Sequence, residues 1–398
     1  MLNRPDFFAP SIARLRLVSF RSYGKADCQF GPGINILTGA NGVGKTNILE
    51  AVSLLGSGRG LRSANFSEIM NRDSEVGWSV RADMALSTGP SDVLVSYAGE
   101  ARKLSMDGDQ RPNFESLTSA LPQLWLTPAM DRLFVDGASG RRKFMDRFTL
   151  TLVRGFGQHA SAFEKAMRER NKLLGDENWS RHRIWLDSLE DTMAIHAVAI
   201  AAGRLNALDA LADGLAFLPD TNFPQSGLAL DGELEAALRS QAALDVEDYY
   251  RERLAANRAL DAGAGRTLIG PHRSDFLVHN LDKNMPASQC STGEQKALLV
   301  GLILAQAHCV ASRTSEVPLL LLDEIAAHMD ANRRSALADV LGHLGGQVWI
   351  TGTDTDSFRS FQNNTTHVFV EDGLAVPQSG VADTNVDKLY GPGHIETV

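Results

Sequence analysis

The sequence has few cysteines and no long apolar run. Its three cysteines, Cys28, Cys290 and Cys309, lie far apart and show no CxxC or Cys/His ligand spacing. This excludes a disulfide framework and a zinc site, and it predicts three small buried side chains. No apolar run reaches the roughly 18 to 20 residues that a membrane span needs, and the first residues, MLNRPDFFAP, lack the basic start and apolar block of a secretion signal. We therefore expect a cytoplasmic protein.

Basic residues are in the minority as well. The net charge of -9 and the pI near 5.6 argue against a uniformly basic coat for nucleic acid. Residues 141–183 are an exception, with eleven Lys or Arg against five acids. Such a stretch either neutralises DNA phosphates or forms a solvated helix face with internal ion pairs, such as Glu164 with Arg168. The candidates for DNA contact are Arg141, Arg142, Lys143, Arg168, Arg170 and Lys172.

The pattern of apolar residues predicts an α/β core divided in sequence by a helical insertion. INILTG, from Ile34, is typical of a strand that runs into a glycine loop, and NILEAVSLL after it has helical spacing. Short strand-like runs between residues 77 and 108 predict a small antiparallel sheet. The predicted parts are residues 1–140 and 263–375 for the α/β core, residues 141–262 for a helical lobe without coiled-coil heptads, and residues 376–398 for a tail.

The stretch GANGVGKT matches GxxxxGK[ST], the phosphate-binding loop called Walker A. Its backbone N–H groups would cradle the phosphates of ATP, the lysine would reach the β and γ phosphates, and the threonine would offer its hydroxyl to Mg²⁺. The alternative is a simple glycine turn between a strand and a helix. The ATP-binding candidates are Gly39, Ala40, Asn41, Gly42, Val43, Gly44, Lys45 and Thr46.

Two acids follow a buried strand in LLLLDEIAAHMD. A site that hydrolyses ATP needs a carboxylate on the metal and a base near the attacking water. Asp323 is the candidate metal ligand and Glu324 the candidate base. The alternative is a helix N-cap, because acids after a strand also complement a helix dipole.

A second helix start suited to an anion lies in QCSTGEQKALLVGLILAQA. We call STGEQ the signature segment and the helix that it begins the signature helix. Ser291 is a plausible N-cap, and Gly293 lets a phosphate approach the backbone. One nucleotide cannot easily use two such helix starts from a single subunit. We therefore expect this segment to complete the ATP site of a second subunit in a two-fold dimer, the alternative being an ordinary capped helix.

These motifs together resemble the ABC ATPase head, and three longer stretches resemble the RecF family: GANGVGKTNILEAVSLLGSGRGLRS, LTPAMDRLFVDGASGRRKFMDRF and TLIGPHRSDF. The resemblance implies a mixed sheet with flanking helices, a small antiparallel β-subdomain and a helical second lobe. It also implies ATP-driven dimerisation, weak DNA-stimulated ATP hydrolysis, and binding to double-stranded or gapped DNA. Partners of the RecR and RecO type, recombinase loading and the SOS response belong to the same expectation.

The resemblance also carries over individual positions. Ser291, Gly293 and Gln295 would contact the partner's γ-phosphate, and Asp330 would lie at the dimer interface. Lys45 and Glu324 would act in catalysis. Thr46 and Asp323 would bind the metal. Gln123 is the candidate for the Q-loop glutamine. QVWITGTD lacks the switch histidine of transporter heads, so Thr351 or Thr353 would sense the γ-phosphate.

Some basic residues near these motifs have two alternative roles. Arg59 and Arg62 either support the phosphate site or cover the end of the following helix, and His272 and Arg273 either bind phosphate or link the insertion to the core. Three other functions compete with the RecF reading: a transporter ATPase subunit, a P-loop kinase, and a scaffold with a vestigial P-loop. The helical insertion and GPHRSDF disfavour a transporter subunit, and the signature helix disfavours a kinase. The intact Lys45, Thr46, Asp323 and Glu324 disfavour a vestigial P-loop.

Overall fold

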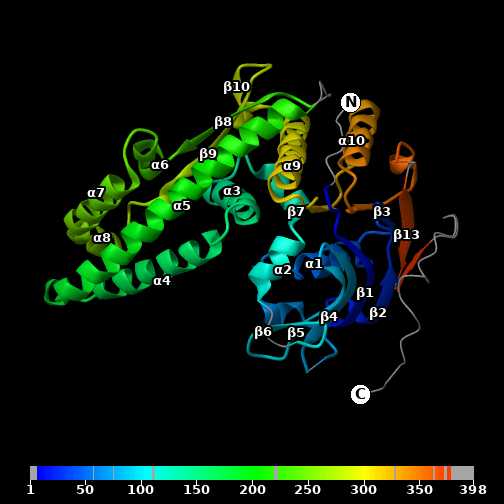
Figure 1. Cartoon of the computed structure of the whole chain (residues 1–398), viewed down its shortest axis with the longest axis horizontal. Helices are drawn as coiled ribbons and strands as arrows, with labels where there is room; N and C mark the ends of the chain where they lie inside the picture. Colours follow the sequence, from blue (N-terminus) through cyan, green and yellow to red (C-terminus); the bar gives the residue numbers. More distant parts are fainter. Residues whose placement is uncertain are drawn as a thin grey trace.

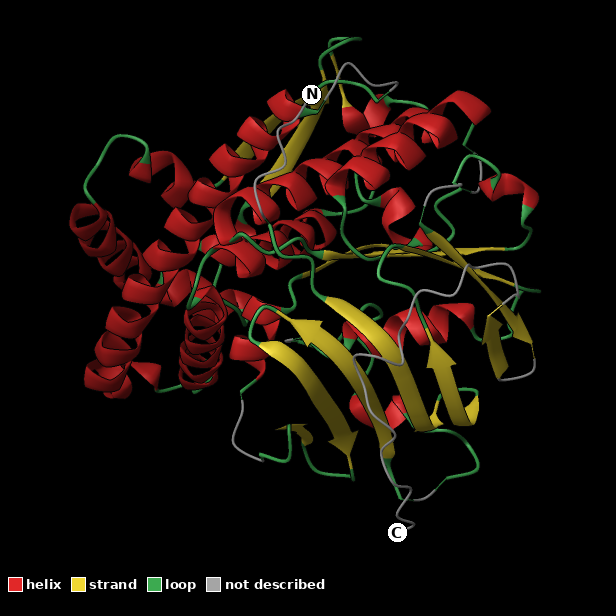
Figure 2. Ribbon diagram, turned by 45° about the vertical axis from the view of Figure 1, so that its right-hand side comes forward, coloured by secondary structure: helices red, strands yellow, loops and turns green. Residues whose placement is uncertain are grey.

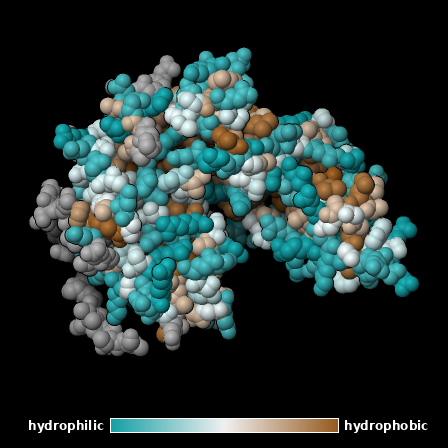
Figure 3. Space-filling view, turned by 180° about the vertical axis from the view of Figure 1, so that it is seen from behind, coloured by the Kyte–Doolittle hydropathy of each residue, from teal (hydrophilic) through white to brown (hydrophobic). Residues whose placement is uncertain are grey.

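The computed structural model describes residues 7–56, 58–74, 76–109, 113–218, 223–326, 329–361, 364–371 and 374–377. The chain forms two lobes, a larger one that contains the first and last described residues and a helical one that projects from it (Figure 1). Seen from behind, the surface is hollowed between the two lobes (Figure 3). The expected tail, residues 376–398, lies outside the described residues from residue 378 onward.

A six-stranded sheet forms the centre of the larger lobe within the described residues. Its order is β14 (Leu374–Pro377), β13 (Thr365–Glu371), β3 (Ile34–Thr38), β12 (Val348–Gly352), β11 (Leu319–Leu322) and β7 (Gln123–Leu126). All neighbours pair in parallel except β14 with β13. Every residue of β3 and β11 is buried, as continuous apolar strands must be when both faces of a sheet are covered. The carboxyl ends of β3, β7, β11 and β12 therefore meet at one edge.

A second, antiparallel sheet lies against this core. Its order is β2 (Tyr23–Gln29), β1 (Ser11–Phe20), β4 (Trp78–Leu86), β5 (Gly89–Tyr97) and β6 (Arg102–Met106). Buried and less buried residues alternate along β4, which is the pattern of a sheet with one face on the core. Helix α1 (Lys45–Ser53) packs between the two sheets, since its apolar residues share one buried cluster with residues of both. Figure 2 shows the strands and the helices that cover them.

The helical lobe is built around one long helix that leads back to the core (Figure 1). Its helices are α3 (Ala138–Leu152), α4 (Phe156–Leu174), α5 (Arg183–Phe217), α6 (Glu233–Leu238), α7 (Ala243–Ala256) and α8 (Arg258–Ala264). A three-stranded sheet of β8 (Ser226–Asp231), β9 (Asp275–Asn280) and β10 (Met285–Pro286) packs with them. Of its strands, β8 lies in the stretch predicted to be helical, and β9 and β10 lie in the part predicted to be α/β. The described part contains no long coiled coil, in agreement with the expected fold class.

Helices α9 (Thr292–Thr314) and α10 (Ala331–Leu344) complete the larger lobe. One buried cluster joins α9 to the β-sheet and to α3 and α5 of the helical lobe. Short helices occupy several turns: α2 (Phe114–Ala120), η1 (Phe66–Ile69), η2 (Pro128–Arg132), η3 (Trp179–His182), η4 (Pro271–Arg273), η5 (Ala287–Gln289) and η6 (Asp356–Phe358).

The expectation that no segment is long and apolar enough to span a membrane is wrong for two helices. The helical stretch Trp179–Ala216 and helix α9 meet both criteria by length and hydropathy. Their most apolar windows are 61% and 78% buried inside the protein. A helix enclosed by neighbours on most sides needs apolar residues all round, so protein packing accounts for this composition in both.

The three cysteines are free and buried, as predicted. Burial raises the pKa of the Cys28 thiol to about 12 and that of Cys309 to about 11. At neutral pH both are therefore protonated thiols that pack as small apolar side chains.

Candidate active site

The glycine loop connects β3 to α1 and depends on two of its glycines. Gly39 and Gly44 have φ angles of 150° and 114°, in the range that other residues rarely adopt. A Cβ atom on Gly39 would lie 2.2 Å from the Val370 carbonyl oxygen, and one on Gly44 would lie 2.5 Å from the Tyr23 hydroxyl. That hydroxyl donates a hydrogen bond to the Gly44 carbonyl at 3.1 Å. The loop therefore requires glycine at both positions, for backbone angle and for space.

Lys45 is the first residue of α1 and is only 5% exposed. Its Nζ donates to the carbonyl oxygens of Gly39 at 2.6 Å and Ala40 at 2.8 Å. Burial lowers its pKa, while the nearby carboxylates of Glu324 and Asp323 act in the opposite direction. The ammonium group thus lies against the loop, at the start of a helix whose first N–H groups point outward. This is an arrangement that can bind a polyphosphate.

Thr46 and Asp323 meet across the edge of the sheet, although 277 positions separate them in sequence. The Thr46 hydroxyl lies 2.9 Å from Oδ1 and 3.1 Å from Oδ2 of Asp323. Asp323 follows the last residue of β11 and is 4% exposed. A hydroxyl and a carboxylate beside a phosphate loop are hard oxygen donors, which Mg²⁺ prefers. The two residues therefore fit a magnesium ion that takes its remaining ligands from phosphate and water.

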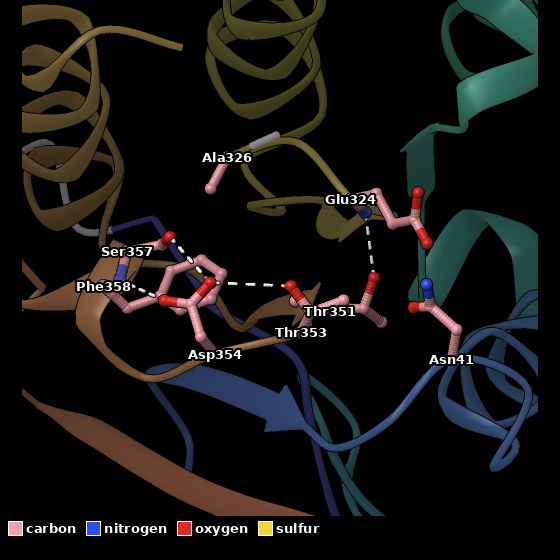
Figure 4. Close-up of a pocket in the computed structure, with 9 residues that line it drawn as sticks. Asn41, Glu324, Ala326, Thr351, Thr353, Asp354, Ser357 and Phe358 are labelled. Carbon is pink, nitrogen blue, oxygen red and sulfur yellow. Dashed lines mark hydrogen bonds between the residues drawn. The ribbon is translucent and has the colours of Figure 1, made fainter. Parts of the chain in front are cut away.

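Glu324 adopts a left-handed backbone conformation, with φ of 52°. Its N–H donates to the Thr351 hydroxyl at 2.9 Å, and its carboxylate faces Asn41 of the glycine loop (Figure 4). The two residues lie in the wall of a pocket at the carboxyl edge of the sheet. The pocket is lined by Asn41, Glu324, Ala326, Thr351, Gly352, Thr353, Asp354, Ser357 and Phe358. A carboxylate in this position can accept a proton from a water molecule beside a bound γ-phosphate.

The signature segment begins helix α9 and is open on its outer side. Ser291 is the N-cap and forms a capping box with Glu294, whose carboxylate accepts from the Ser291 N–H at 2.9 Å. The hydrogen bonds from Lys283 and Ser291 lower the pKa of Glu294 to about 2. Within the described part of the chain, no atom outside the helix's own nearby backbone and the two adjacent residues lies within 4 Å of where a Cβ on Gly293 would be. Among the described residues that line the pocket, none belongs to this segment.

Two predicted positions near the signature have local roles in the structure. Gln295 is 5% exposed, and its side-chain amide donates to the Cys290 carbonyl at 2.8 Å. It faces its own chain, which contradicts the expected contact with a partner's nucleotide. Asp330 is exposed and caps α10, where its carboxylate accepts from the Arg333 N–H at 2.9 Å. This bond lowers the pKa of Asp330.

Gln123 is at the wrong end of the sheet for a Q-loop. It pairs with Leu319 at the start of β11, whereas Leu126 pairs with Leu322, directly before Asp323. The glutamine is buried and lies at the amino edge of a parallel pair, so it cannot reach a nucleotide at the carboxyl edge. The corresponding position at that edge is Thr127, which follows β7.

Several basic residues near the motifs have structural partners. Arg62 and Arg21 both pair with the buried carboxylate of Glu50 in α1, so Arg62 covers that helix. Arg59 contacts the Asn65 side chain at 3.4 Å. His272 bonds to the Thr267 carbonyl at 3.0 Å and has its pKa lowered by burial, which favours the linking role.

The structure contradicts one of the predicted DNA contacts, Arg170, and gives Arg141 and Arg142 partners within the chain. Arg170 is fully buried, and its guanidinium bonds to Glu190 at 2.8 Å and to Asp261 at 2.7 Å. Arg141 forms a bidentate salt bridge with Asp275, and each of its two hydrogen bonds is 2.8 Å long. Arg142 donates to the Ser274 carbonyl at 2.7 Å. All three guanidinium groups join helices to neighbouring segments. Arg170 is buried and not available to DNA, whereas Arg141 and Arg142 are half-buried.

The other three candidates are on the surface. Lys143, Arg168 and Lys172 are exposed, and so are four basic residues of the same stretch that were not singled out: Arg154, Lys165, Arg181 and Arg183. Arg168 lies 3.6 Å from Glu164, so the alternative of an ion pair within the helix holds for this one residue. Exposed pairs of this kind contribute little stability.

Two functional positions were missed or left open in the sequence. Tyr23 supports the glycine loop from a different sheet, and no local pattern around it reveals a contact made 21 positions away. Thr351 was one of two candidates for sensing phosphate. The structure places it between Asp323 and Glu324, with its hydroxyl donating to Asp323 at 2.7 Å. The signal for it was a hydroxyl at the end of a buried apolar strand.

A family model and relatives of known name match most of this chain. The family model described as RecF/RecN/SMC N terminal domain matches residues 11–375. A relative from Rhizobium etli, called DNA replication and repair protein RecF, is 45% identical over 370 residues, or 91% of this chain and 98% of the relative. A relative of the same name from Allorhizobium ampelinum is 46% identical over 371 residues, or 91% and 97%.

Solved structures share the fold. One described as the recombination mediator protein RecF with ATP in the RecFOR pathway has a TM-score of 0.81 at 21% identity and covers 95% of this chain and 100% of that chain. The Smc head domain from Pyrococcus furiosus has a TM-score of 0.53 at 16% identity, covering 93% and 96%. These likenesses confirm the expected fold class, an ABC-type ATPase head with a helical second lobe.

Proposed function

This chain belongs to the RecF family, and from that premise we propose that it is an ATP-dependent DNA-binding protein of recombinational and gap repair and replication restart. The relatives are DNA replication and repair proteins by name, and a structural neighbour is a recombination mediator of the RecFOR pathway. We extend these roles to this chain, with partners of the RecR and RecO type, a function in the SOS response and a cytoplasmic location. A transporter subunit finds no support among these relatives.

We propose that the P-loop pocket binds and slowly hydrolyses ATP. Residues 39–46 bind the phosphates, with Lys45 as their cation, and Thr46 and Asp323 would hold Mg²⁺. The metal, when bound, supplies positive charge against the phosphate oxygens. Glu324 takes a proton from the attacking water as the bond to the γ-phosphorus forms and the bond to the β-phosphate oxygen breaks. DNA binding would stimulate this step.

The observation that carries the proposal is the open start of α9. Ser291 is already satisfied by its capping box, and no described residue outside helix α9 occupies the space above Gly293. This helix start can bind an anion. Yet none of its described residues lines the pocket beside the chain's own P-loop. A second copy resolves this, because a two-fold dimer places each signature on the other subunit's ATP. ATP thereby joins the two subunits, with Asp330 at their interface.

The dimer test uses sedimentation velocity with and without ATP and Mg²⁺. The wild type shifts toward dimer mass with ATP, and Lys45→Ala does not, because the phosphates lose their cation. Gly293→Glu also stays monomeric, since its carboxylate repels the partner's γ-phosphate, but it still binds ATP within about threefold of the wild-type Kd. Gly342→Glu in α10 is the matched control, because its Cβ position is equally open, and it dimerises normally. An ATP-driven dimer of Gly293→Glu would refute the composite site.

We further propose that the exposed basic residues of α4 contact DNA phosphates. Lys165 and Lys172 lie seven positions apart on this helix, about two turns, and therefore share a face. The double change Lys165→Glu and Lys172→Glu weakens binding to gapped DNA by about tenfold or more and flattens its salt dependence. Lys25→Glu with Lys103→Glu is the control, an equal charge change on exposed residues of the antiparallel sheet. Equal loss in both double variants would remove α4 from the DNA surface.

A further inference from the structure

One hydroxyl group joins the two carboxylate residues of the pocket. Thr351 lies in β12, between the P-loop strand β3 and the Asp323 strand β11, and is fully buried. Its hydroxyl donates its proton to Asp323 Oδ1 at 2.7 Å and accepts the Glu324 N–H at 2.9 Å. Figure 4 shows the second of these bonds. A single side chain therefore fixes the carboxylate of one residue and the backbone of the next.

The bond between Thr351 and Asp323 lies directly beyond the last backbone pair of β11 and β12. The parallel ladder between β11 and β12 runs to the pair Leu322 and Ile350. The next residues in that register, Asp323 and Thr351, are joined through the threonine side chain. Glu324 then turns out of the strand into a left-handed conformation at φ 52°. Such a conformation in a residue other than glycine persists only where its surroundings hold it, and the bond to Thr351 is one direct restraint on it.

The turn decides where the Glu324 side chain points. With its N–H on Thr351, Glu324 directs its carboxylate toward Asn41 of the glycine loop (Figure 4). Without that acceptor, the N–H would have to find another partner, and the left-handed turn would lose this restraint and keep the weaker one from Lys296, whose Nζ donates to the Glu324 carbonyl at 3.4 Å. Asp323 would keep only the Thr46 hydroxyl as a side-chain donor among the described residues. Loss of one hydroxyl thus disturbs both the metal ligand and the base.

We propose that Thr351 is a positioning residue for ATP hydrolysis, which holds Asp323 and Glu324 in their reactive arrangement. This rests on the ATPase activity proposed above and adds a residue that acts through the metal ligand and the base. Its effect is specific to the chemical step, because Lys45 and the loop backbone, which bind ATP, make no contact with it in the bonds described here. The expected signature is therefore a lowered kcat with little change in nucleotide affinity.

The test measures kcat, KM and the Kd for a fluorescent ATP analogue in four proteins. Thr351→Val keeps the shape and removes the hydroxyl, and we expect kcat to fall by about 10- to 100-fold, the effect of losing a hydrogen bond to a charged group. The Kd should stay within about threefold. Thr351→Ser keeps the hydroxyl and should restore kcat to within about threefold of the wild type. Thr149→Val, the same change at a buried threonine in α3, should be neutral for kcat.

The outcomes distinguish the positioning role of Thr351 from the proposed ATPase activity on which it rests. A wild type without ATPase activity refutes the proposed function itself. An active wild type with Thr351→Val as fast as Thr149→Val overturns the positioning role, and so does a Thr351→Ser variant as slow as the valine variant, because the methyl group would then be the cause. If Thr351→Val does not fold, Thr351→Ala removes the same hydroxyl without placing a second methyl group beside Asp323, and the same comparison with Ser decides.

Discussion

Glu324→Gln abolishes most ATP hydrolysis while leaving ATP binding intact. The change keeps the size of the side chain and the backbone bond to Thr351, so only the proton acceptor is lost. General-base catalysis typically contributes a factor of about 10² to 10⁴, and we expect kcat to fall by at least about 100-fold. Steady-state phosphate release measures the rate, and a fluorescent ATP analogue measures binding, which should stay within about threefold.

The same variant should also stay dimeric in ATP. In the wild type, hydrolysis removes the γ-phosphate that joins the subunits, so the dimer decays as ATP is consumed. Glu324→Gln keeps its ATP, and its sedimentation should remain at dimer mass over that period. Asp356→Asn is the matched control, an exposed acid paired with Arg359 just outside the pocket. A Glu324→Gln protein with kcat near that of Asp356→Asn would exclude Glu324 as the base.

Arg170→Met destabilises the helical lobe by about 3 to 5 kcal/mol. Arg170 bonds to Glu190, Asp261, the Thr267 hydroxyl and the Leu254 carbonyl, all between 2.7 and 3.0 Å. Removing one member of a buried charge network leaves its partners without compensation, which typically costs this much. Glu190 keeps its pair with Arg258. The carboxylate of Asp261, which is 1% exposed, keeps one donor among the described residues, the Leu268 N–H at 3.0 Å.

Arg168→Met is the control for this change, because it lies two residues away on the same helix. Arg168 has a side chain 67% exposed and, among the described residues, one ion pair, to Glu164 at 3.6 Å, so the variant should differ from wild type by less than about 0.5 kcal/mol. Urea unfolding followed by circular dichroism and by tryptophan fluorescence compares the two. Unfolding of both variants at the same urea concentration would show that the buried network adds no stability.

These two arginines show what patterns of charge cannot predict. Both belong to the basic stretch at residues 141–183, yet one is exposed and the other fully buried. Residues two apart on an α-helix point about 200° away from each other, so one face of α4 meets solvent when the other meets the core. Which face is buried depends on Asp261, 91 positions further along the chain. The carboxylate that neutralises Arg170 is invisible in the local sequence.

The nucleotide loop is the opposite case. Gly39, Gly44 and Lys45 lie within seven residues, and their chemistry is a property of that short segment. The strand before it and the helix after it follow from the change of apolar period from the run at Ile34 to the helix at Lys45. The fold class could be predicted in the same way, since a continuous apolar strand ending in Asp323 and Glu324 is typical of a buried parallel sheet.

The sequence alone therefore determined the contiguous parts of this protein: the glycine loop, the acids that end β11 and the capped start of α9. It also determined the α/β class, because these features depend on residues that are neighbours in the chain. Only the tertiary structure decided that Thr351 joins Asp323 to Glu324, that Gln123 lies at the far edge of the sheet, and that Gln295 and Arg170 face inward. The physical reason is that register, burial and ion pairing are set by contacts between segments far apart in sequence, which no local spacing encodes.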